Sequence, residues 1–573
     1  MAEKEKELYN LWCKQANQDV DLIEELKSIS DNDDEIYERF YKELEFGTAG
    51  LRGIIGAGTN RINIYTVGRT TQGLANSLKK SEKNASVAIS YDSRIKAKLF
   101  AEECACILAA NGIKAYITKE LQPTPVLSFA VREYKCSAGI MITASHNPAK
   151  YNGYKCYGSD GCQMTDDNAN KVYEEILNVD IFNDVKKITF KEGIEQGLIE
   201  YISNDFYQNY LDKVQQQSIN PNICKGADLK VVYTPLNGAG NKLVREILSR
   251  IGVKNISVVK QQENPDGNFP TCPYPNPEFK EALNLALDLA NEVKPDLILA
   301  TDPDSDRVGI AVKNEKGTRL MTGNEVGIML INYILSCRKA NGSLPKNPVA
   351  VKTIVTSPLV DKICEKYNCE LKTVLTGFKY IGDQILRLEK INEEDRYVFG
   401  FEESYGYLAG TYVRDKDAVV ASMLICEMAA YYRKQGKDLV DVINSIYEEY
   451  GYYQGTTLNF TFEGSAGMKK MQDVMENLRS NPLKNIAEIE ITSIVDYKKS
   501  ESVDLENCKI NQIDLPKSNV IEYGLKGNLK VIIRPSGTEP KIKVYITSVG
   551  KDIDDASEKT KSITEFMTNL INN

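Results

Sequence analysis

Short apolar runs alternate with amphipathic, helix-like patterns along most of this chain. The apolar run at 85–92 predicts a strand, residues 98–112 predict a helix, and residues 113–119 predict a second strand. A helix after residues 123–125 and a buried strand at 137–142 continue the alternation. This order of elements is typical of a mainly parallel sheet with crossover helices, and it predicts an α/β fold.

The same order starts again near residue 229 and a third time near residue 323. The segments that predict these two cycles are 229–240, 241–252, 279–293 and 296–300, followed by 323–335, 348–357, 370–382 and 397–400. From about Leu458 the character changes, because the strands at 529–534 and 541–546 lie close together and a helix at 554–567 follows them. The last part of the chain therefore reads as a smaller α+β domain.

Length and charge narrow the classes of function. A chain of 573 residues is too long for one hydrophobic core and suggests about four domains. The net charge is −9 and no long run gathers Lys and Arg, so we expect neither a nucleic-acid nor a membrane partner. The apolar segment from Ala418 to Tyr432 contains Glu427 and is too short to span a bilayer.

The cysteines and the N-terminus bear on where the protein works. Thirteen cysteines without a CxxC pair, together with a single histidine, nearly exclude a Cys/His zinc site. We read the cysteines as reduced and mostly buried, as in a cytoplasmic protein. The first ten residues are charged and do not resemble a signal peptide, which agrees with a cytoplasmic location.

The loop TASHNP carries the only histidine, His146, directly after Ser145. A hydrolase would use such a pair as nucleophile and base. On extended backbone, however, adjacent side chains point to opposite faces, so we expect His146 to be poorly placed to deprotonate its neighbour. No third orienting group is visible in the sequence. A capped turn with a solvated serine is an equally good reading of this loop alone.

The loop TDPDSDRVG follows the buried strand at 296–300. Asp302, Asp304 and Asp306 alternate, and we expect Pro303 to keep the backbone extended, with the three carboxylates on one side. Such carboxylates repel one another unless a cation lies between them, and oxygen ligands suit Mg²⁺. An EF-hand is excluded, because its glycine and glutamate are missing. The segment DSDRV also fits a phosphatase motif in which Asp304 would be the nucleophile.

Two further loops also follow predicted strands. Open α/β sheets bind their ligands at the carboxyl ends of strands, which is where these loops begin. GFEESYGYL, at 400–408, offers acceptors for sugar hydroxyls, and a surface turn is its plainer reading. Lys416 downstream reads equally as a ligand contact or an exposed charge. In LKVIIRPSGTEPKIKVYI, the residues typical of a phosphate site are Arg534, Ser536, Gly537, Thr538 and Lys541, although a hairpin turn would suit the same letters.

Taken together and in this order, the loops closely resemble those of the α-D-phosphohexomutase superfamily. The resemblance runs from FGTAGLRG (46–53) to RPSGTEPK (534–541), and within the superfamily it is closest to the longer bacterial, phosphopentomutase-like branch of phosphoglucomutases. It implies three related α/β domains and a smaller C-terminal α+β domain around a central cleft. We place these domains at residues 1–204, 205–321, 322–455 and 456–573.

The resemblance also implies roles for individual residues. Ser145 would carry the phosphoryl group and, with the three aspartates, would bind Mg²⁺. The family's other catalytic positions match Arg52, His146, Lys155 and Arg307. Its contacts to the sugar and to the phosphate that is not reacting match Thr376, Glu402, Ser404, Lys416, Arg534, Ser536, Gly537 and Thr538.

The implied reaction is the interconversion of glucose 1-phosphate and glucose 6-phosphate through a glucose 1,6-bisphosphate intermediate. The implied partners are small sugar phosphates, with no obligate protein partner. Phe401 departs from the pattern, since many relatives have glycine there. A phosphopentomutase or a mutase of mixed specificity, including phosphomannomutase, therefore stays open as to substrate. Two other classes of protein remain as alternatives: a phosphatase that uses Asp304, and a non-catalytic paralogue with a binding role.

Overall fold

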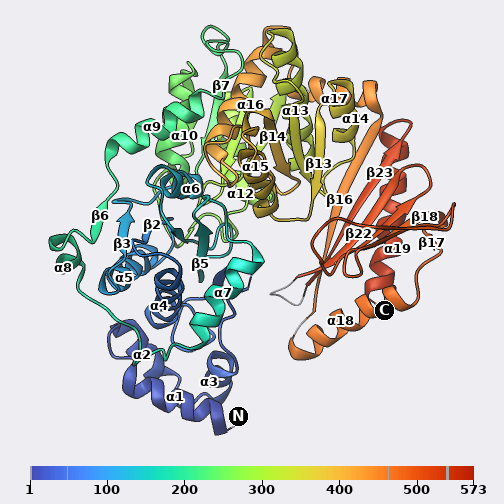
Figure 1. The fold of residues 1–573 in the computed structure, drawn as a ribbon. Helices are drawn as coiled ribbons and strands as arrows, with labels where there is room; N and C mark the ends of the chain where they lie inside the picture. The colour runs from blue at the N-terminus through green and yellow to red at the C-terminus, as the bar shows by residue number, and fades with distance from the viewer. Residues whose placement is uncertain (1–2, 48, 316, 463, 537–540, 573) are drawn as a thin grey trace.

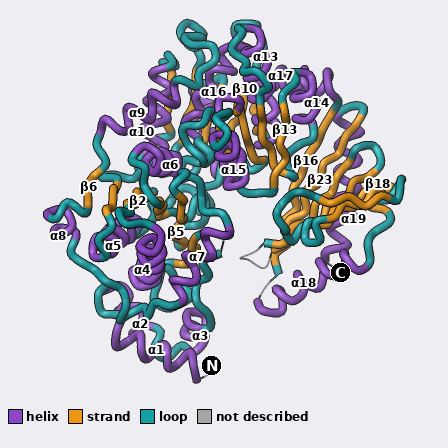
Figure 2. Tube along the Cα trace, in the orientation of Figure 1, coloured by secondary structure: helices purple, strands orange, loops and turns teal. Residues whose placement is uncertain are grey.

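The computed structural model describes residues 3–47, 49–315, 317–462, 464–536 and 541–572. These described residues form four sheets, which follow one another along an arc in Figure 1 from the N-terminal helices to the C-terminal sheet. Helices and strands alternate through the first three sheets, as Figure 2 shows, whereas the fourth is mostly strand. Gly537 and Thr538 lie outside the described residues.

Three helices, α1 (Glu3–Gln15), α2 (Val20–Ser28) and α3 (Asp33–Phe40), precede the first sheet. That sheet has the strand order β1-β5-β4-β2-β3-β6, in which β4, β2, β3 and β6 are parallel, and β5 pairs antiparallel with both β4 and β1. Its elements are β1 (Gly50–Ile54), α4 (Ile64–Ser81), β2 (Ser86–Tyr91), α5 (Ala97–Ala110), β3 (Lys114–Ile117), α6 (Thr124–Glu133), β4 (Ala138–Ile142), β5 (Tyr151–Gly158), α7 (Asp166–Leu177), α8 (Phe190–Glu195) and β6 (Ile199–Tyr201). The predicted β-α-β-α-β order from 85 to 142 is confirmed.

The second sheet has the order β11-β10-β9-β7-β8, with β9, β7 and β8 parallel and β10 and β11 added as antiparallel hairpins. Its elements are α9 (Asn204–Gln215), β7 (Lys230–Thr234), α10 (Gly240–Arg250), β8 (Asn255–Val258), α11 (Lys260–Glu263), α12 (Lys280–Val293), β9 (Leu297–Thr301), β10 (Val308–Asn314) and β11 (Gly317–Met321).

The third sheet has the order β13-β12-β14-β15, of which the first three strands are parallel. Its elements are α13 (Gly323–Ala340), β12 (Val349–Thr353), α14 (Leu359–Lys366), β13 (Glu370–Val374), α15 (Phe378–Glu389), the 3₁₀ helix η1 (Glu394–Arg396), β14 (Tyr397–Glu402), β15 (Gly406–Leu408), α16 (Ala418–Arg433) and α17 (Leu439–Tyr450).

Helix α16 is buried from Ala418 to Ala430, because it packs against α10 and α9 as well as against α13. The carboxylate of Glu427 interrupts its apolar sequence. That carboxylate accepts hydrogen bonds from the backbone N–H groups of Ile219 and Asn220 and from the hydroxyl of Tyr333. A buried charge needs such partners, and here they tie the second and third α/β units together.

The fourth sheet is antiparallel, in the order β16-β23-β22-β21-β18-β19-β20, with β17 paired to β18. Its elements are β16 (Tyr452–Thr461), α18 (Gly464–Ser480), β17 (Asn485–Ile486), β18 (Ile489–Asp496), β19 (Glu501–Asp504), β20 (Lys509–Gln512), β21 (Ile521–Leu525), β22 (Leu529–Pro535), β23 (Lys541–Gly550) and α19 (Ile553–Asn572). Its own core includes Ile563 and Met567 of α19. The predicted C-terminal α+β unit is confirmed.

Two expectations about the whole chain can be compared with the structure. All thirteen cysteines are free and only Cys13 and Cys508 are exposed, which confirms the reading of reduced, mostly buried residues. In the part of the chain that the structure describes, every helix is too short or too polar to cross a bilayer.

Candidate active site

The first three candidate loops meet where the strands before them end. Ser145 follows β4, Asp302 follows β9, and the serine hydroxyl Oγ lies 2.9 Å from the carboxylate Oδ2 of Asp302. The third loop joins them, since Arg307 forms a β-bridge with Gly406. Carboxyl ends of strands are where open α/β sheets place their ligands, so three sheets contribute to one site.

The structure corrects the expectation that Ser145 and His146 point apart. Ser145 is not extended; its φ is +53°, and this left-handed turn brings its Oγ to 3.1 Å from Nδ1 of His146. A serine hydroxyl carries one proton, so His146 must donate from Nδ1 whenever Oγ–H points at Asp302. Among the hydrogen bonds of the described residues, none joins the histidine ring to a carboxylate. The third member of a hydrolase triad is therefore missing there.

Burial and two arginines keep His146 uncharged. Burial lowers the pKa of His146 well below its usual value, and the positive charges of Arg307 and Arg52 lower it further. The imidazole is thus neutral near pH 7. It can pass a proton without adding a fixed positive charge to the site.

Arg94, which sequence reasoning missed, holds the Ser145 loop from behind. Its guanidinium group is fully buried and donates to three backbone carbonyls of that loop, those of Ser145 at 2.6 Å, Pro148 at 3.0 Å and Asn147, and to that of Tyr151, the first residue of β5, at 2.8 Å. The same group lies 5.2 Å from the ring centre of Phe269, which belongs to the second α/β unit. A planar group with five donors suits this task better than a lysine would.

Asp92 and Thr143 fix the serine through its backbone. The N–H of Ser145 donates to Thr143 Oγ1 at 2.7 Å, and that hydroxyl donates to Asp92 Oδ2 at 2.6 Å. Burial raises the pKa of Asp92 to about 6. Its carboxylate also lies 3.6 Å from Nε of Arg94, so the two side chains form one support beneath the loop.

The aspartate loop is a turn and not the extended segment that we expected. Ser305 has φ +50°, and the backbone N–H groups of Asp306 and Arg307 fold back onto Asp302 Oδ1 at 3.1 and 2.9 Å. The turn, instead of strand alternation, brings Asp302, Asp304 and Asp306 together, with ligand atoms within 4.8 Å of one another. Convergence was predicted correctly, but for the wrong backbone reason.

Lysines surround this acidic cluster. Nζ of Lys155 lies 2.9 Å from Asp304 Oδ2 and 3.5 Å from Asp306 Oδ2, and Nζ of Lys416 lies 3.0 Å from Asp306 Oδ2. Burial would raise the pKa of Asp306, but Lys416, Lys155 and Arg307 together hold it below its usual value. Burial and the neighbouring carboxylates raise the pKa of Asp302. Lys416 is therefore part of the site and not an exposed charge.

The chemistry of the cluster fits a hard cation. The Oδ1 atoms of Asp304 and Asp306 are buried without a hydrogen-bond partner, which is costly unless a cation approaches them. Thr124, at the start of α6, holds Asp304 in place: its hydroxyl donates to Oδ2 at 3.0 Å and its N–H donates to the backbone carbonyl at 2.8 Å. The sequence offered no signal for Thr124, since 180 residues separate it from its partner.

Arg52 and Lys155 share one face of the first sheet. β1 and β5 pair with Arg52 opposite Gly153 and Lys155 opposite Gly50, so the two long side chains are diagonal neighbours over glycines. A Cβ atom at Gly153 would lie 2.5 Å from the backbone oxygen of Thr143, so the glycine allows a close approach of the Ser145 loop. Arg307 is held by Glu278, with Nη1 2.9 Å from Oε1.

The candidate residues for sugar binding lie at or after the carboxyl ends of strands in the third sheet. Glu402 is 7% exposed, and its Oε1 accepts from the N–H of Gly377 at 2.9 Å, next to Thr376. Ser404 follows in the same loop, half-buried. Burial, with the charge of Glu402, raises the pKa of Glu403 to about 7.

The fourth candidate loop comes from β22. Arg534 pairs in register with Lys543 of β23, and its Nη1 lies 3.5 Å from the hydroxyl of Tyr545. The N–H of Ser536 donates to the carbonyl of Lys541 at 2.7 Å. Burial lowers the pKa of Lys543, which feels the charges of Glu278 and Glu403. Ile532 of β22 and Tyr545 of β23 are buried in one cluster with Ile354, Val355 and Leu375, so the fourth sheet packs against loops of the third. Lys543 is a further cation that the motifs did not reveal.

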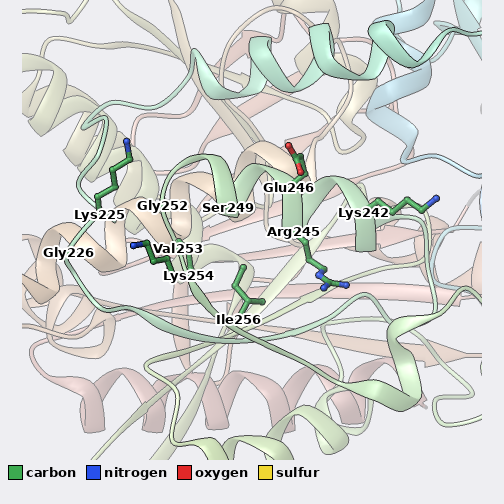
Figure 3. Close-up of a pocket in the computed structure, with 10 residues that line it drawn as sticks. All are labelled: Lys225, Gly226, Lys242, Arg245, Glu246, Ser249, Gly252, Val253, Lys254 and Ile256. Atoms are coloured by element: carbon green, nitrogen blue, oxygen red, sulfur yellow. The ribbon is translucent and has the colours of Figure 1, made fainter.

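A separate surface pocket of about 960 Å³ lies along α10, away from these loops (Figure 3). It is lined by the cations Lys225, Lys242, Arg245 and Lys254. Lys242 is paired with Glu120, and Nη1 of Arg245 lies 2.8 Å from Glu263 Oε1. In Figure 3 Lys225 and Lys242 stand at opposite ends of the pocket, so its cations do not converge on one anion.

Comparison with known proteins agrees with this geometry. Three family models match: "Phosphoglucomutase/phosphomannomutase, alpha/beta/alpha domain I" over residues 43–181, domain II over 208–317 and domain III over 322–450. The phosphoglucomutase of Staphylococcus saprophyticus is 38% identical over 92% of this chain and 94% of its own length. That of Staphylococcus aureus is 36% identical over 96% and 98%.

Solved structures show the same fold. A putative phosphomannomutase from Thermus thermophilus superposes with a TM-score of 0.67 at 20% identity, covering 91% of this chain and 99% of its own. Parafusin, a phosphoglucomutase from Paramecium in its open form, gives 0.66 at 17% identity, covering 92% and 96%. The chain belongs to the phosphoglucomutase/phosphomannomutase family of the α-D-phosphohexomutase superfamily. It is an enzyme of the isomerase class, a mutase.

Proposed function

We propose that this enzyme is a magnesium-dependent phosphoglucomutase that interconverts glucose 1-phosphate and glucose 6-phosphate. Ser145 carries the phosphoryl group, and glucose 1,6-bisphosphate is the intermediate. The observation that carries this proposal is the contact of Ser145 Oγ with Asp302 at 2.9 Å, inside a buried triad of carboxylates flanked by two lysines. Relatives named phosphoglucomutase, 36–38% identical over most of the chain, support glucose as the sugar.

In the first half-reaction the bond between phosphorus and Ser145 Oγ breaks as a bond forms from phosphorus to O6 of glucose 1-phosphate. The proton of the 6-hydroxyl leaves O6, and one proton returns to Oγ. In the second half-reaction the 1-phosphate of the bisphosphate moves to Oγ, and the proton of Oγ ends on O1. Charges and atoms balance over the cycle, and the enzyme regains its phosphoserine.

The residues present supply what phosphoryl transfer needs, namely positioning and neutralisation of charge. Asp302, Asp304, Asp306 and the Ser145 phosphate would hold Mg²⁺, which would neutralise charge on the phosphoryl group when bound. Lys155 lies beside two of these aspartates, where its ammonium can also contact the phosphoryl oxygens. His146, 3.1 Å from Oγ, is the nearest side chain that can exchange the serine proton.

Those of the remaining predicted residues that the structure describes have positions that suit the rest of the substrate. Glu402 is an acceptor for sugar hydroxyls at the end of β14, and Ser404 follows it. Thr376 adjoins Glu402 through Gly377. Arg534 and Ser536, with Gly537 and Thr538, would hold the phosphate that is not reacting. Arg52 and Arg307 would hold the one that is.

The test is a coupled assay of glucose 1-phosphate conversion with Mg²⁺, with and without glucose 1,6-bisphosphate. We expect conversion to glucose 6-phosphate, stimulation by the bisphosphate, and no conversion by Ser145→Ala. Phosphate release that persists in Ser145→Ala would instead support a phosphatase with Asp304 as nucleophile. No conversion by protein whose Ser145 is phosphorylated would exclude glucose, and a higher kcat/KM with ribose phosphates would make it a phosphopentomutase.

A further inference from the structure

The first three helices lie outside the family match, which begins at residue 43. They are nevertheless part of the core of the first α/β unit. Trp12, the only tryptophan of the chain, is 1% exposed and packs edge-to-face against Phe40, Tyr65 and Phe182, with ring centres 5.9, 5.6 and 5.4 Å away. Residues 3–40, which we call the N-terminal brace, are therefore docked on α4 and not a loose extension.

One end of the brace holds the loop 55–61. Glu25 Oε2 accepts from the N–H of Ala57 at 2.7 Å, while Oε1 lies 2.5 Å from Nη1 of Arg39. Arg39 in turn donates to the carbonyl of Ala57 at 3.3 Å and accepts at its own carbonyl from the N–H of Asn60. Gly56 has φ +153°, and a Cβ atom there would lie 2.6 Å from Glu25 Oε1. This loop is thus shaped to receive the brace.

The loop 55–61 leads directly into the site. It continues β1, on which Arg52 stands, and its first residue, Ile55, donates to the carbonyl of Lys150 at 2.8 Å, where the Ser145 loop ends. A displacement at Ala57 would therefore shift β1 against β5, and with it Arg52 against Lys155. Small displacements of groups that position a phosphoryl group are costly in rate.

A second contact of the brace holds the segment 92–96, which supports the Ser145 loop. Nζ of Lys96 lies 2.7 Å from Asp19 and 2.8 Å from Asp21. Lys96 has φ +60° and ends the segment 92–96, which contains Arg94, the residue that holds the Ser145 loop. The carbonyl of Ile95 in this segment accepts from the side chain of Asn152, at the start of β5.

We propose that the N-terminal brace is a positioning element of the active site, in which Glu25 fixes the loop after Arg52 and Asp19 fixes the segment that contains Arg94. This inference rests on the proposed function, since it assumes that Arg52 and the Ser145 loop act on the phosphoryl group. The brace touches neither the substrate nor the reacting atoms. It acts through the two segments that it holds.

The experiment compares Glu25→Ala with Glu24→Ala, a matched control on the exposed neighbour of Glu25, and with Glu25→Gln, which keeps an acceptor for the Ala57 N–H. Three readouts are needed: kcat and KM, amide hydrogen exchange of residues 55–61, and Trp12 emission, which reports docking of the brace. For Glu25→Ala we expect kcat to fall about tenfold, with faster exchange at 55–61 and unchanged emission. Glu25→Gln should recover most of the rate, and Glu24→Ala should behave as wild type.

Wild-type exchange at 55–61 in Glu25→Ala, or an equal loss of rate in Glu24→Ala, would overturn the inference. If Glu25→Ala shifts the emission of Trp12, the brace has come away, and Asp19→Asn becomes the deciding variant: faster exchange at 92–96 with unchanged emission supports the brace, and unchanged exchange overturns it. The exchange readout needs no turnover. If the wild-type enzyme does not convert glucose phosphates, the proposed function fails, while exchange still decides whether the brace holds these segments.

Discussion

Arg94→Lys is expected to loosen the Ser145 loop while keeping the positive charge beneath it. Arg94 donates to the carbonyls of four residues between 145 and 151, and its guanidinium group is fully buried. A lysine ends in one nitrogen, which can reach about two of these oxygens. The others would be left buried and without a donor.

The cost can be worked out from those contacts. Two charge-assisted hydrogen bonds lost, at about 1.5–3 kcal/mol each, give a destabilisation of about 3–6 kcal/mol. For a cooperative unit of roughly 200 residues, each kcal/mol lowers the Tm by about 2–4 °C, so we expect a fall of about 6–24 °C. Because the loop would carry the phosphoserine in the proposed function, we also expect kcat to fall on the order of a hundredfold.

The assay is thermal unfolding together with steady-state kinetics of glucose 1-phosphate conversion. Arg69→Lys is the matched control, because Nε of Arg69 also donates to two backbone carbonyls, those of Ile176 at 3.2 Å and Val179 at 3.0 Å, away from the site. Arg69→Lys should lower the Tm, since one ammonium can keep both contacts only in part. It should leave kcat within about twofold, because these contacts lie away from the site. An Arg94→Lys enzyme with the Tm and kcat of the wild type would refute the reasoning.

Four further outcomes are expected. Ser145→Ala should abolish conversion while keeping the wild-type Tm within a few degrees, measured by the coupled assay and by thermal unfolding. Chelation of divalent cations should stop the reaction and added Mg²⁺ should restore it, and Asp306→Asn should need at least about tenfold more Mg²⁺ for half the maximal rate. The pKa of Glu403 is raised to about 7, so the folded state binds one more proton than the unfolded state between about pH 4.5 and 7. The free energy of unfolding should therefore fall by about 3 kcal/mol as pH rises through that window. Glu403→Gln should remove this loss, measured by unfolding experiments at pH 5 and 7.5. Phe401→Ala should cost about 3–5 kcal/mol of stability while leaving the ratio of kcat/KM for glucose and ribose phosphates within about threefold, because its ring is buried away from the site.

The periodic parts of the fold were predictable from the sequence. The predicted strands 137–142 and 296–300 are short runs that are apolar after a polar first residue, and in the structure they become the buried strands β4 and β9. A central parallel strand has neighbours on both sides and helices on both faces, so its sequence carries the signal by itself. The site motifs follow such strands, which is why Ser145 and Asp302 could be expected near one another.

What the sequence did not reveal depends on contacts between distant residues. Arg94 binds carbonyl groups, which every residue has, so nothing in the sequence of the Ser145 loop indicates its partner. Thr124 reaches Asp304 across 180 residues. The two errors about backbone have one cause, since both Ser145 and Ser305 adopt a left-handed conformation that alternation arguments do not consider.

Within β14, side chains do alternate between the two faces of the strand. This alternation shows which face is affected by Phe401, the residue that departs from the family pattern. Phe401 and Glu402 are adjacent on a strand, so their side chains point to opposite faces. Phe401 is 1% exposed, and a Cβ atom at Gly327 of α13 would lie 2.1 Å from its ring, which places the ring in the core under that helix. Glu402 then faces the loop at Gly377. An aromatic residue where the resemblance implies glycine therefore affects the packing behind the loop, and in the proposed function the choice of sugar would depend on the face that Glu402 presents.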